Sequence, residues 1–289
     1  MAEIAALRER ILSVKQTLKI TSAMYLISQA KSRRARTQLE KVQPFFEVIK
    51  DTIADVLRHS TMVKHPYFGA PKLSHGEAGL VVISGDKGLA GSYNREVIDL
   101  TRRTAEAYDN VTLFCVGEMG RRMFIQRGMQ PEPNFLYSAG EPTLSRAWEM
   151  SRQLLELFKK NKLREILLVY TRMTSPLSTS PLVLPLLPLD PNNPRWRDRS
   201  VRSDNVMIYE PSVDAVISRL VPSYLAGVLY AAMTESYCSE NCDRRSAMQT
   251  ATDNGNDMLN RLSKRYNRLR QEMITQQITE VTGGFEATN

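Results

Sequence analysis

The sequence predicts an α/β fold in which long helices at the two chain ends pair as an antiparallel coiled coil, with an α/β domain inserted between them. Two observations lead to this prediction. Apolar residues near both ends recur at alternating spacings of three and four, and the middle alternates short apolar runs with helical stretches. With 289 residues, 42% of them hydrophobic, the chain can also bury a sizeable core.

The N-terminal segment 1–60 has the spacing of one coiled-coil helix. Its first apolar positions are Ile4, Leu7, Ile11, Val14 and Leu18. The same phase continues through Thr21, Tyr25, Ser28, Ser32 and Ala35, where the side chains are small or polar, and then through Leu39 and Val42. Pro44 is expected to kink this helix or restart it, because proline lacks the backbone donor that a helix needs.

The C-terminal segment 211–284 predicts the second long helix. Pro211 fits its first turn, although Pro222, Gly227 and Gly255 are potential breakers within it. Near its end the alternating spacing returns at Leu259, Leu262, Tyr266, Leu269 and Met273. A helix of this size would be roughly 100 Å long. It needs a partner along its apolar seam, and the N-terminal helix, running antiparallel, is the obvious one.

The middle segment 78–209 indicates a Rossmann-like domain. Runs of strand type occur at 79–84, 111–116, 135–137 and 165–170, and helical stretches occur at 92–109, 118–127 and 143–161. This alternation predicts a mainly parallel sheet with helices on its faces. The proline-rich stretch 176–194 is expected to form an edge hairpin and a loop.

No catalytic, cofactor-binding or metal-ligating residues are indicated. The loop from Gly85 to Gly91 follows a strand and precedes a helix, which is the context of a phosphate-binding turn. It has neither a P-loop signature nor a full G-x-G-x-x-G, so a tight strand-to-helix turn is the better interpretation. Cys238 and Cys242 lack the further Cys or His that zinc requires nearby, which favours buried thiols.

Positive charge is concentrated near the N-terminus of a chain whose net charge is +8. Between residues 15 and 41 there are seven Lys or Arg and one acid, Glu40. A second basic run comprises Arg261, Lys264, Arg265, Arg268 and Arg270. Such runs indicate a solvated surface, contact with an acidic protein surface, or binding to nucleic acid. Few aromatic residues are interleaved for base stacking, which favours protein contact.

Several segments resemble, in order and position, the gamma subunit of the F-type ATP synthase. They include RILSVKQTLKITSAM (10–24), AKSRRA (30–35), DKGLAGSYN (86–94), LLPL (186–189), YEP (209–211), AMQTATDN (247–254), YNRLRQEMIT (266–275) and EVTGG (280–284). The resemblance implies a non-catalytic rotor whose coiled coil turns inside a ring of three alpha and three beta subunits. The α/β domain would lie against the epsilon subunit and the membrane c-ring. Proton or sodium flow would drive the rotation that couples ion transport to ATP synthesis or hydrolysis.

The resemblance also implies contact roles for particular residues. Arg270 and Gln271 match positions that hydrogen-bond a beta-subunit loop, and Met24 matches a position near the beta lever. The basic cluster of Lys31, Arg33 and Arg34 would meet the acidic lever loops of beta. Tyr209 and Glu210 match the region at the c-ring and epsilon. The small or polar residues Ser28, Ser32 and Ala35 are expected to suit a surface that slides within the ring.

This sequence departs from the family pattern at a few positions. Tyr25 stands where the family usually has a charged residue, and Ser28 and Gln29 replace small apolar residues. Asp243 and Arg245 replace a common Ala and Met, and Gly85 replaces a Ser. These departures bear on the detailed shaft contacts more than on the resemblance itself.

The expected location is the cytoplasmic face of a bacterial plasma membrane, with membrane association through the complex alone. The sequence contains no run of 18 uncharged apolar residues, no signal-peptide pattern at its start and no chloroplast-type insert. No cofactor and no nucleic-acid partner are expected for a rotor subunit. The alternative functions are a stand-alone coiled-coil adaptor and a nucleic-acid-binding protein.

Overall fold

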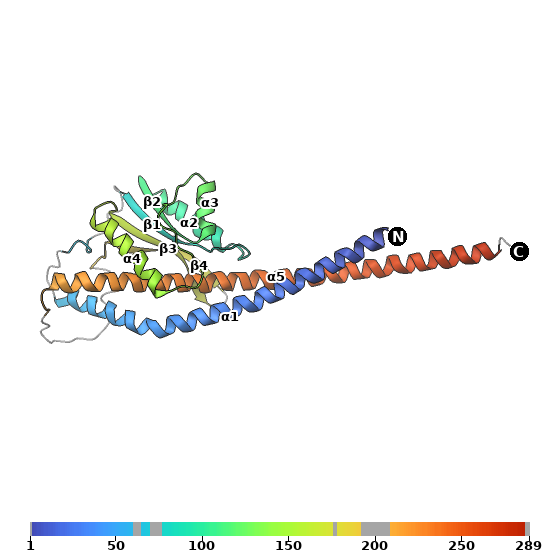
Figure 1. The fold of residues 1–289 in the computed structure, drawn as a ribbon, viewed down its shortest axis with the longest axis horizontal. Coiled ribbons are helices and arrows are strands. Elements are labelled where there is room, and N and C mark those ends of the chain that lie inside the picture. The colour runs from blue at the N-terminus through green and yellow to red at the C-terminus, as the bar shows by residue number, and fades with distance from the viewer. Residues whose placement is uncertain (1, 60–64, 70–76, 176–177, 192–208, 287–289) are drawn as a thin grey trace. The chain divides into compact units, whose positions relative to one another are not determined.

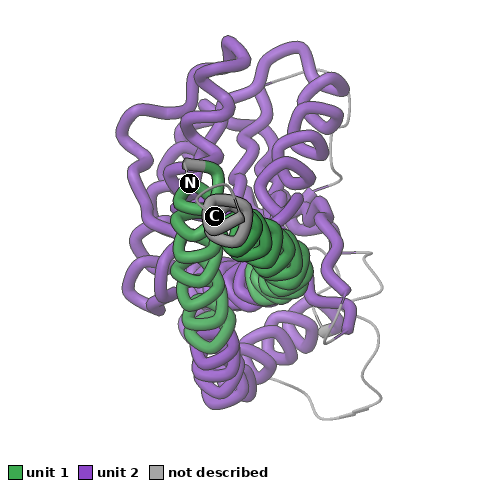
Figure 2. Tube along the Cα trace, turned by 90° about the vertical axis from the view of Figure 1, so that its right-hand side faces the viewer, with its two compact units in different colours: residues 1–28, 244–289 green, residues 29–243 purple. Residues whose placement is uncertain are grey.

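The computed structural model describes residues 2–59, 65–69, 77–175, 178–191 and 209–286. The chain divides into two compact units, residues 1–28 with 244–289, and residues 29–243 (Figure 2). Helix α1, Ala2–His59, and helix α5, Val213–Glu286, both have residues in each unit. Within the proline-rich stretch expected from the sequence, residues 176–177 and 192–194 lie outside the described part.

The second unit contains a four-stranded sheet in the order β2-β1-β3-β4 (Figure 1). Strand β1, Glu77–Ile83, pairs in parallel with β2, Asn110–Val116, and with β3, Glu165–Ser175. Strand β4, Ser178–Leu187, pairs antiparallel with β3 at the edge of the sheet. The prediction of a mainly parallel sheet is therefore confirmed. The proline-rich stretch supplies only one strand of the edge hairpin, β4, and β3 supplies the other.

Helices cover both faces of this sheet, because successive strand side chains point to opposite faces and both sets are apolar. Helices α2, Tyr93–Ala105, and α3, Glu118–Gln126, pack on the face that carries Leu80, Val82, Leu113, Cys115, Leu167 and Val169. Helix α4, Leu144–Lys159, and the first part of α5 pack on the other face. Thr143 caps the N-terminus of α4, and its hydroxyl accepts a hydrogen bond from the Arg146 amide.

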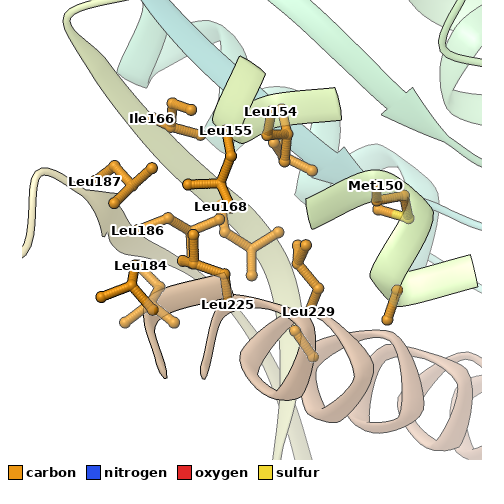
Figure 3. Close-up of a cluster of buried hydrophobic side chains, with 14 of the residues drawn as sticks. Met150, Leu154, Leu155, Ile166, Leu168, Leu184, Leu186, Leu187, Leu225 and Leu229 are labelled. Atoms are coloured by element: carbon orange, nitrogen blue, oxygen red, sulfur yellow. The ribbon is translucent and has the colours of Figure 1, made fainter. Parts of the chain in front are cut away.

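The larger core lies between the sheet, α4 and α5 (Figure 3). Its leucine-rich centre comprises Met150, Leu154 and Leu155 of α4, Ile166 and Leu168 of β3, Leu184, Leu186 and Leu187 of β4, and Leu225 and Leu229 of α5. Burying each such side chain contributes roughly 1.5–3 kcal/mol. This core fixes the α/β domain to the N-terminal part of α5.

The prediction of a strand at 135–137 is wrong. Tyr137 forms one isolated bridge with Val116, and Pro131 forms another with Leu113. Two nearby prolines, Pro131 and Pro133, cannot donate to a strand ladder. Instead, the Phe135 ring is buried and lies 5.2 Å from the Phe114 ring.

Of the two outcomes expected at Pro44, a kink or a restart, the restart is excluded, since one helix runs from Ala2 to His59. Pro44 is exposed, so its missing amide hydrogen leaves a carbonyl that water can reach. Just after it α1 stays attached to α5: Phe46 packs against Tyr230, with ring centroids 6.5 Å apart. Packing of this face outweighs the local cost of the proline.

The first unit is an antiparallel helix pair, as predicted. Glu3 forms an ion pair with Arg265 at 2.8 Å, and the hydroxyls of Thr21 and Thr252 lie 2.8 Å apart. Leu18 approaches so closely that a Cβ at Gly255 would lie 2.7 Å from its Cδ2. All ten seam positions named from the sequence in segments 1–18 and 259–273 are buried or half-buried. The alternating spacing thus identified the interhelical seam.

By length and composition, an 18-residue window of α5 within Val213–Thr279 is apolar enough to cross a membrane. Half of that window is buried inside the protein. The N-terminal part of α5 supplies the core leucines described above, and burial in a core is a sufficient reason for its apolar character.

Candidate partner-contact surfaces

Lys31, Arg33 and Arg34 form an exposed basic cluster on α1. Helical spacing places Lys31 and Arg34 on one side of the interhelical seam and Arg33 on the other side. Lys31 and Arg34 line a cavity of about 230 Å³ together with Glu141, Pro142 and Tyr237. The structure therefore brings two of the three predicted cations to one hollow.

Sequence reasoning did not find the other side of this hollow. Glu141 and Pro142 belong to the loop before α4, and Tyr237 belongs to α5. They lie far from Lys31 in the sequence and carry no motif of their own. Two cations against one carboxylate leave the hollow with a net positive charge, which favours an acidic side chain from a partner.

The prediction that the small or polar residues of α1 form a sliding surface is wrong. Ser28 and Ala35 are only 2% and 4% exposed. Ala35 packs with Tyr237 and Cys238 of α5, and the Ser32 carbonyl accepts a hydrogen bond from the Cys238 thiol at 3.5 Å. Their small size serves the close approach of the two helices of this chain rather than movement against a partner.

The remaining shaft candidates lie in the first unit and occupy different places along it. Met24 is half-buried beside the helix pairing, near the contact of Thr21 with Thr252. Arg270 and Gln271 are both exposed on α5, which extends beyond the N-terminal end of α1 (Figure 1). Eighteen residues of helix separate Thr252 from Arg270, a rise of roughly 27 Å. Met24 therefore lies at a different place along the helix pair from Arg270 and Gln271.

Tyr209 and Glu210 immediately precede α5 in the second unit. Tyr209 is half-buried against the larger core, and Glu210 is exposed. Burial raises the pKa of the Tyr209 phenol, the charge of Asp55 raises it further, and Arg58 lowers it. The pair thus offers an anchored aromatic ring and an exposed carboxylate.

The loop from Gly85 to Gly91 is a tight turn, as interpreted from the sequence. Gly91 and Leu89 both have positive φ, 57° and 63°. The Asp86 carboxylate accepts amide hydrogen bonds from Glu118 at the start of α3 and from Ala139 and Gly140. Burial alone would raise the pKa of this carboxyl, but these bonds and one from Ser138 lower it overall. The Asp86 carboxylate thus occupies the N-terminus of α3 and joins this loop to the loop before α4.

Cys238 and Cys242 are buried thiols, as interpreted from the sequence. Over the described ranges, no group of three or more His, Cys, Asp or Glu side chains is arranged to hold a metal ion.

The departures from the family pattern fall into two classes. Tyr25 and Arg245 are half-buried and Gln29 is exposed, which places all three at or near the helix surface. Gly85 instead lies where the structure leaves too little room for a side chain. A Cβ there would lie 2.9 Å from Oε1 of the buried Glu240 and 3.2 Å from Oδ1 of Asn94, so the common serine would require a shift.

Asp243 connects α5 to the sheet edge. Its carboxylate accepts a hydrogen bond from the Thr179 hydroxyl of β4 at 3.1 Å. Burial raises the pKa of the Asp243 carboxyl to about 6; the Thr179 hydrogen bond lowers it, and the charge of Glu96 raises it. Ionising this carboxyl therefore costs more free energy in the folded protein than in the unfolded chain.

Replacing Asp243 by Asn is expected to stabilise the chain at pH 8 by about 1 kcal/mol, allowing for solvent screening of this half-buried group. The folded pKa lies above the ordinary value near 4, so stability falls as pH rises from about 4 to 6. Asn keeps an acceptor for Thr179 and removes the charge. Urea midpoints should thus differ at pH 8 and converge below about pH 4. Asp257→Asn, at an exposed position on α5, should shift neither midpoint.

Comparison with known proteins gives a match over nearly the whole chain. A family model described as ATP synthase matches residues 3–288. The ATP synthase gamma chain of Ruminiclostridium cellulolyticum is 38% identical over 288 residues, covering 97% of each chain. That of Acetivibrio thermocellus is 38% identical over 293 residues, covering 99% of each. A chain of the Euglena gracilis mitochondrial ATP synthase (OSCP/F1/c-ring, rotational state 3) superposes with a TM-score of 0.68 at 16% identity. This superposition covers 99% of this chain and 95% of that one.

Proposed function

Since the chain belongs to the ATP synthase gamma chain family, we propose how its surfaces serve the central stalk of that rotary enzyme. The chain is the non-catalytic central stalk, which couples ion flow to ATP synthesis or hydrolysis at sites carried by other subunits. The single observation that carries this conclusion is the family match over residues 3–288.

We propose that the stalk works as three mechanical parts: the helix 1–60, the α/β domain 78–209 and the helix 211–284. Two antiparallel helices with a packed seam resist twisting better than one, because each turn is held by side chains of the other. The ring of three alpha and three beta subunits would surround the coiled coil. An asymmetric shaft then presents a different face to each beta subunit at any instant.

Two sets of residues are the proposed beta-subunit contacts. Arg270 and Gln271 are exposed where α5 extends beyond α1, so both can hydrogen-bond an approaching loop. Lys31, Arg33 and Arg34 present positive charge to an acidic loop, and the hollow at Lys31 and Arg34 has room for a carboxylate. Met24 adds a half-buried apolar contact.

In the second unit, Tyr209 and Glu210 are the proposed contacts with the c-ring and the epsilon subunit. The half-buried ring of Tyr209 can hold this segment in place while the Glu210 carboxylate stays exposed for a partner. Through such contacts the chain would lie at the cytoplasmic face of a bacterial plasma membrane, attached by the complex rather than by a span of its own.

The test of the beta contacts is the double substitution Arg270→Ala with Gln271→Ala in the reconstituted complex. ATP hydrolysis is expected to fall about tenfold. A hydrogen bond to a charged group contributes about 1.5–3 kcal/mol, and a tenfold change in rate corresponds to about 1.4 kcal/mol. Both residues are exposed, so the helix content of the free chain should not change. Asn260→Ala with Arg261→Ala, an exposed pair on the same helix, is the matched control. Full hydrolysis by the first variant would exclude this contact.

A further inference from the structure

The paired strands β3 and β4 continue beyond the part of the sheet that β1 reaches. The pairing of β1 with β3 ends at Val169. Beyond this residue, β4 is the only described strand that pairs with β3. We call residues 170–175 of β3 and 178–182 of β4 the hairpin arm. The arm and the parts of α1 and α5 that it contacts all belong to the second unit.

Hydroxyl groups of α5 bond the backbone of the hairpin arm where the sheet gives it no partner. Thr171 lies opposite Pro181 of β4, which has no amide hydrogen to donate. Instead, the Thr171 amide donates to the Ser236 hydroxyl at 3.2 Å, and the Thr171 carbonyl accepts from the Ser239 hydroxyl at 3.3 Å. All three residues are buried, so water cannot replace these partners unless the contact opens.

Two more polar contacts extend this attachment along α5. At its start, Arg172 Nε lies 3.5 Å from Glu235 Oε2. At its end, the Thr179 hydroxyl of β4 donates to the Asp243 carboxylate at 3.1 Å. The hairpin arm thus contacts α5 from residue 235 to residue 243, a rise of roughly 12 Å. Asp243 is also the last residue of α5 in the second unit.

The hairpin arm contacts α1 as well. Met173 of β3 packs against a small buried cluster formed by Ala35 of α1 with Tyr237 and Cys238 of α5. The Arg36 guanidinium of α1 donates to the Met173 sulfur. One segment of the α/β domain is therefore attached to both long helices at the same level.

These contacts differ in kind from those of the larger core. That core attaches the earlier part of α5 to the sheet through apolar side chains, and apolar attraction has no preferred direction. A hydrogen bond, in contrast, weakens steeply when its donor and acceptor lose their alignment. The hairpin arm therefore opposes a rotation of α5 about its own axis, which apolar packing alone would oppose less.

We propose that the hairpin arm is the joint that passes torque from the α/β domain to the two long helices, with Glu235, Ser236 and Ser239 as its positioning residues on α5. This inference rests on the proposed function, in which Tyr209 and Glu210 face the c-ring and the beta contacts lie on α1 and α5. Ion-driven ATP synthesis then requires torque to cross the joint. Hydrolysis by the soluble complex with alpha and beta alone does not, because nothing there holds the α/β domain back.

The first test is Ser236→Ala with Ser239→Ala, in the full complex reconstituted into vesicles. ATP synthesis driven by an imposed gradient of protons and sodium ions is expected to fall about tenfold, because two buried backbone groups of Thr171 lose their partners. Hydrolysis by the soluble complex of the same variant with alpha and beta should stay within about twofold of the parent.

The matched control, Ser151→Ala with Thr234→Val, also removes two buried hydroxyls. Ser151 of α4 bonds the Pro222 carbonyl, away from the hairpin arm, and Thr234 bonds the Tyr230 carbonyl of its own helix. This control should keep both activities within about twofold of the parent. Unchanged synthesis by the serine variant, an equal loss in the control, or a loss of hydrolysis as large as that of synthesis would overturn the proposal.

A charge exchange tests the joint without removing a buried group. Arg172→Glu places two carboxylates together and should lower the ratio of synthesis to hydrolysis about threefold, whereas adding Glu235→Arg should restore it to within about twofold. The same exchange at Arg127 and Asp99, a similarly exposed ion pair away from α5, should leave the ratio unchanged throughout. Failure of Glu235→Arg to restore the ratio would overturn the proposal, whereas a parent chain that supports no synthesis would contradict the proposed function itself.

Discussion

Reversing the charge of the basic cluster, by changing Lys31, Arg33 and Arg34 together to Glu, is expected to lower ATP hydrolysis of the reconstituted complex more than tenfold. The proposed partner surface is acidic, and like charges brought together across an interface cost several kcal/mol. All three side chains are exposed on α1, so the variant should fold as the parent does. Measured at increasing salt, the defect should shrink, because exposed charges are screened beyond roughly 10 Å at 0.1 M.

The matched control reverses three other exposed cations, Arg95, Arg102 and Arg103 on α2. It changes the net charge of the chain by the same amount at a place with no proposed beta contact. Hydrolysis by this control should stay close to that of the parent. Normal turnover by the α1 variant, or an equal loss in both variants, would contradict a specific acidic partner for the basic cluster.

Changing Gly117 to Val is expected to destabilise the α/β domain by about 4 kcal/mol, the largest stability effect anticipated in this chain. Gly117 has φ of 96°, which a β-branched residue rarely adopts. A Cβ there would lie 2.7 Å from the Ser84 hydroxyl oxygen and closer still to the Ser84 carbonyl. The Ser84 hydroxyl already donates to the Val116 carbonyl and accepts from the Gly120 amide, so it cannot move away freely.

The control for backbone strain is Gly128→Val. Gly128 also has positive φ, 78°, but a Cβ there would meet nothing within 4 Å. The Gly128→Val variant should lose about 1–2 kcal/mol of unfolding free energy, from backbone conformation alone. Urea unfolding followed by Trp148 fluorescence, in the Trp196→Phe background, reports on the α/β domain directly. Similar midpoints for the two variants would mean that the close approach to Ser84 adds nothing to the destabilisation by Gly117→Val.

Periodicity predicted the elements of this fold well, because each long-range partner imposes a repeat on the sequence. The three-and-four spacing from Ile4 to Leu18 marked the face of α1 that meets α5, and the apolar run 165–170 marked a strand buried on both faces. The failures have local causes. The run 135–137 is apolar because Phe135 is buried between Phe114 and Tyr137, not because it joins the sheet.

The contact surfaces were only partly predictable. The cations of α1 are visible in the sequence as a basic run, but Glu141 and Tyr237 join them only through the fold. Ser28, Ser32 and Ala35 were misinterpreted because small residues suit a sliding surface and a tightly packed helix pair equally well.

Reconstitution of this chain with the alpha and beta subunits of its own organism, followed by an ATP hydrolysis assay, tests the role of central stalk most directly. The expected result is a stable complex of three alpha, three beta and one copy of this chain, with turnover at several sites in succession. Failure to assemble, accompanied by tight and salt-sensitive binding of the free chain to nucleic acid, would contradict that role.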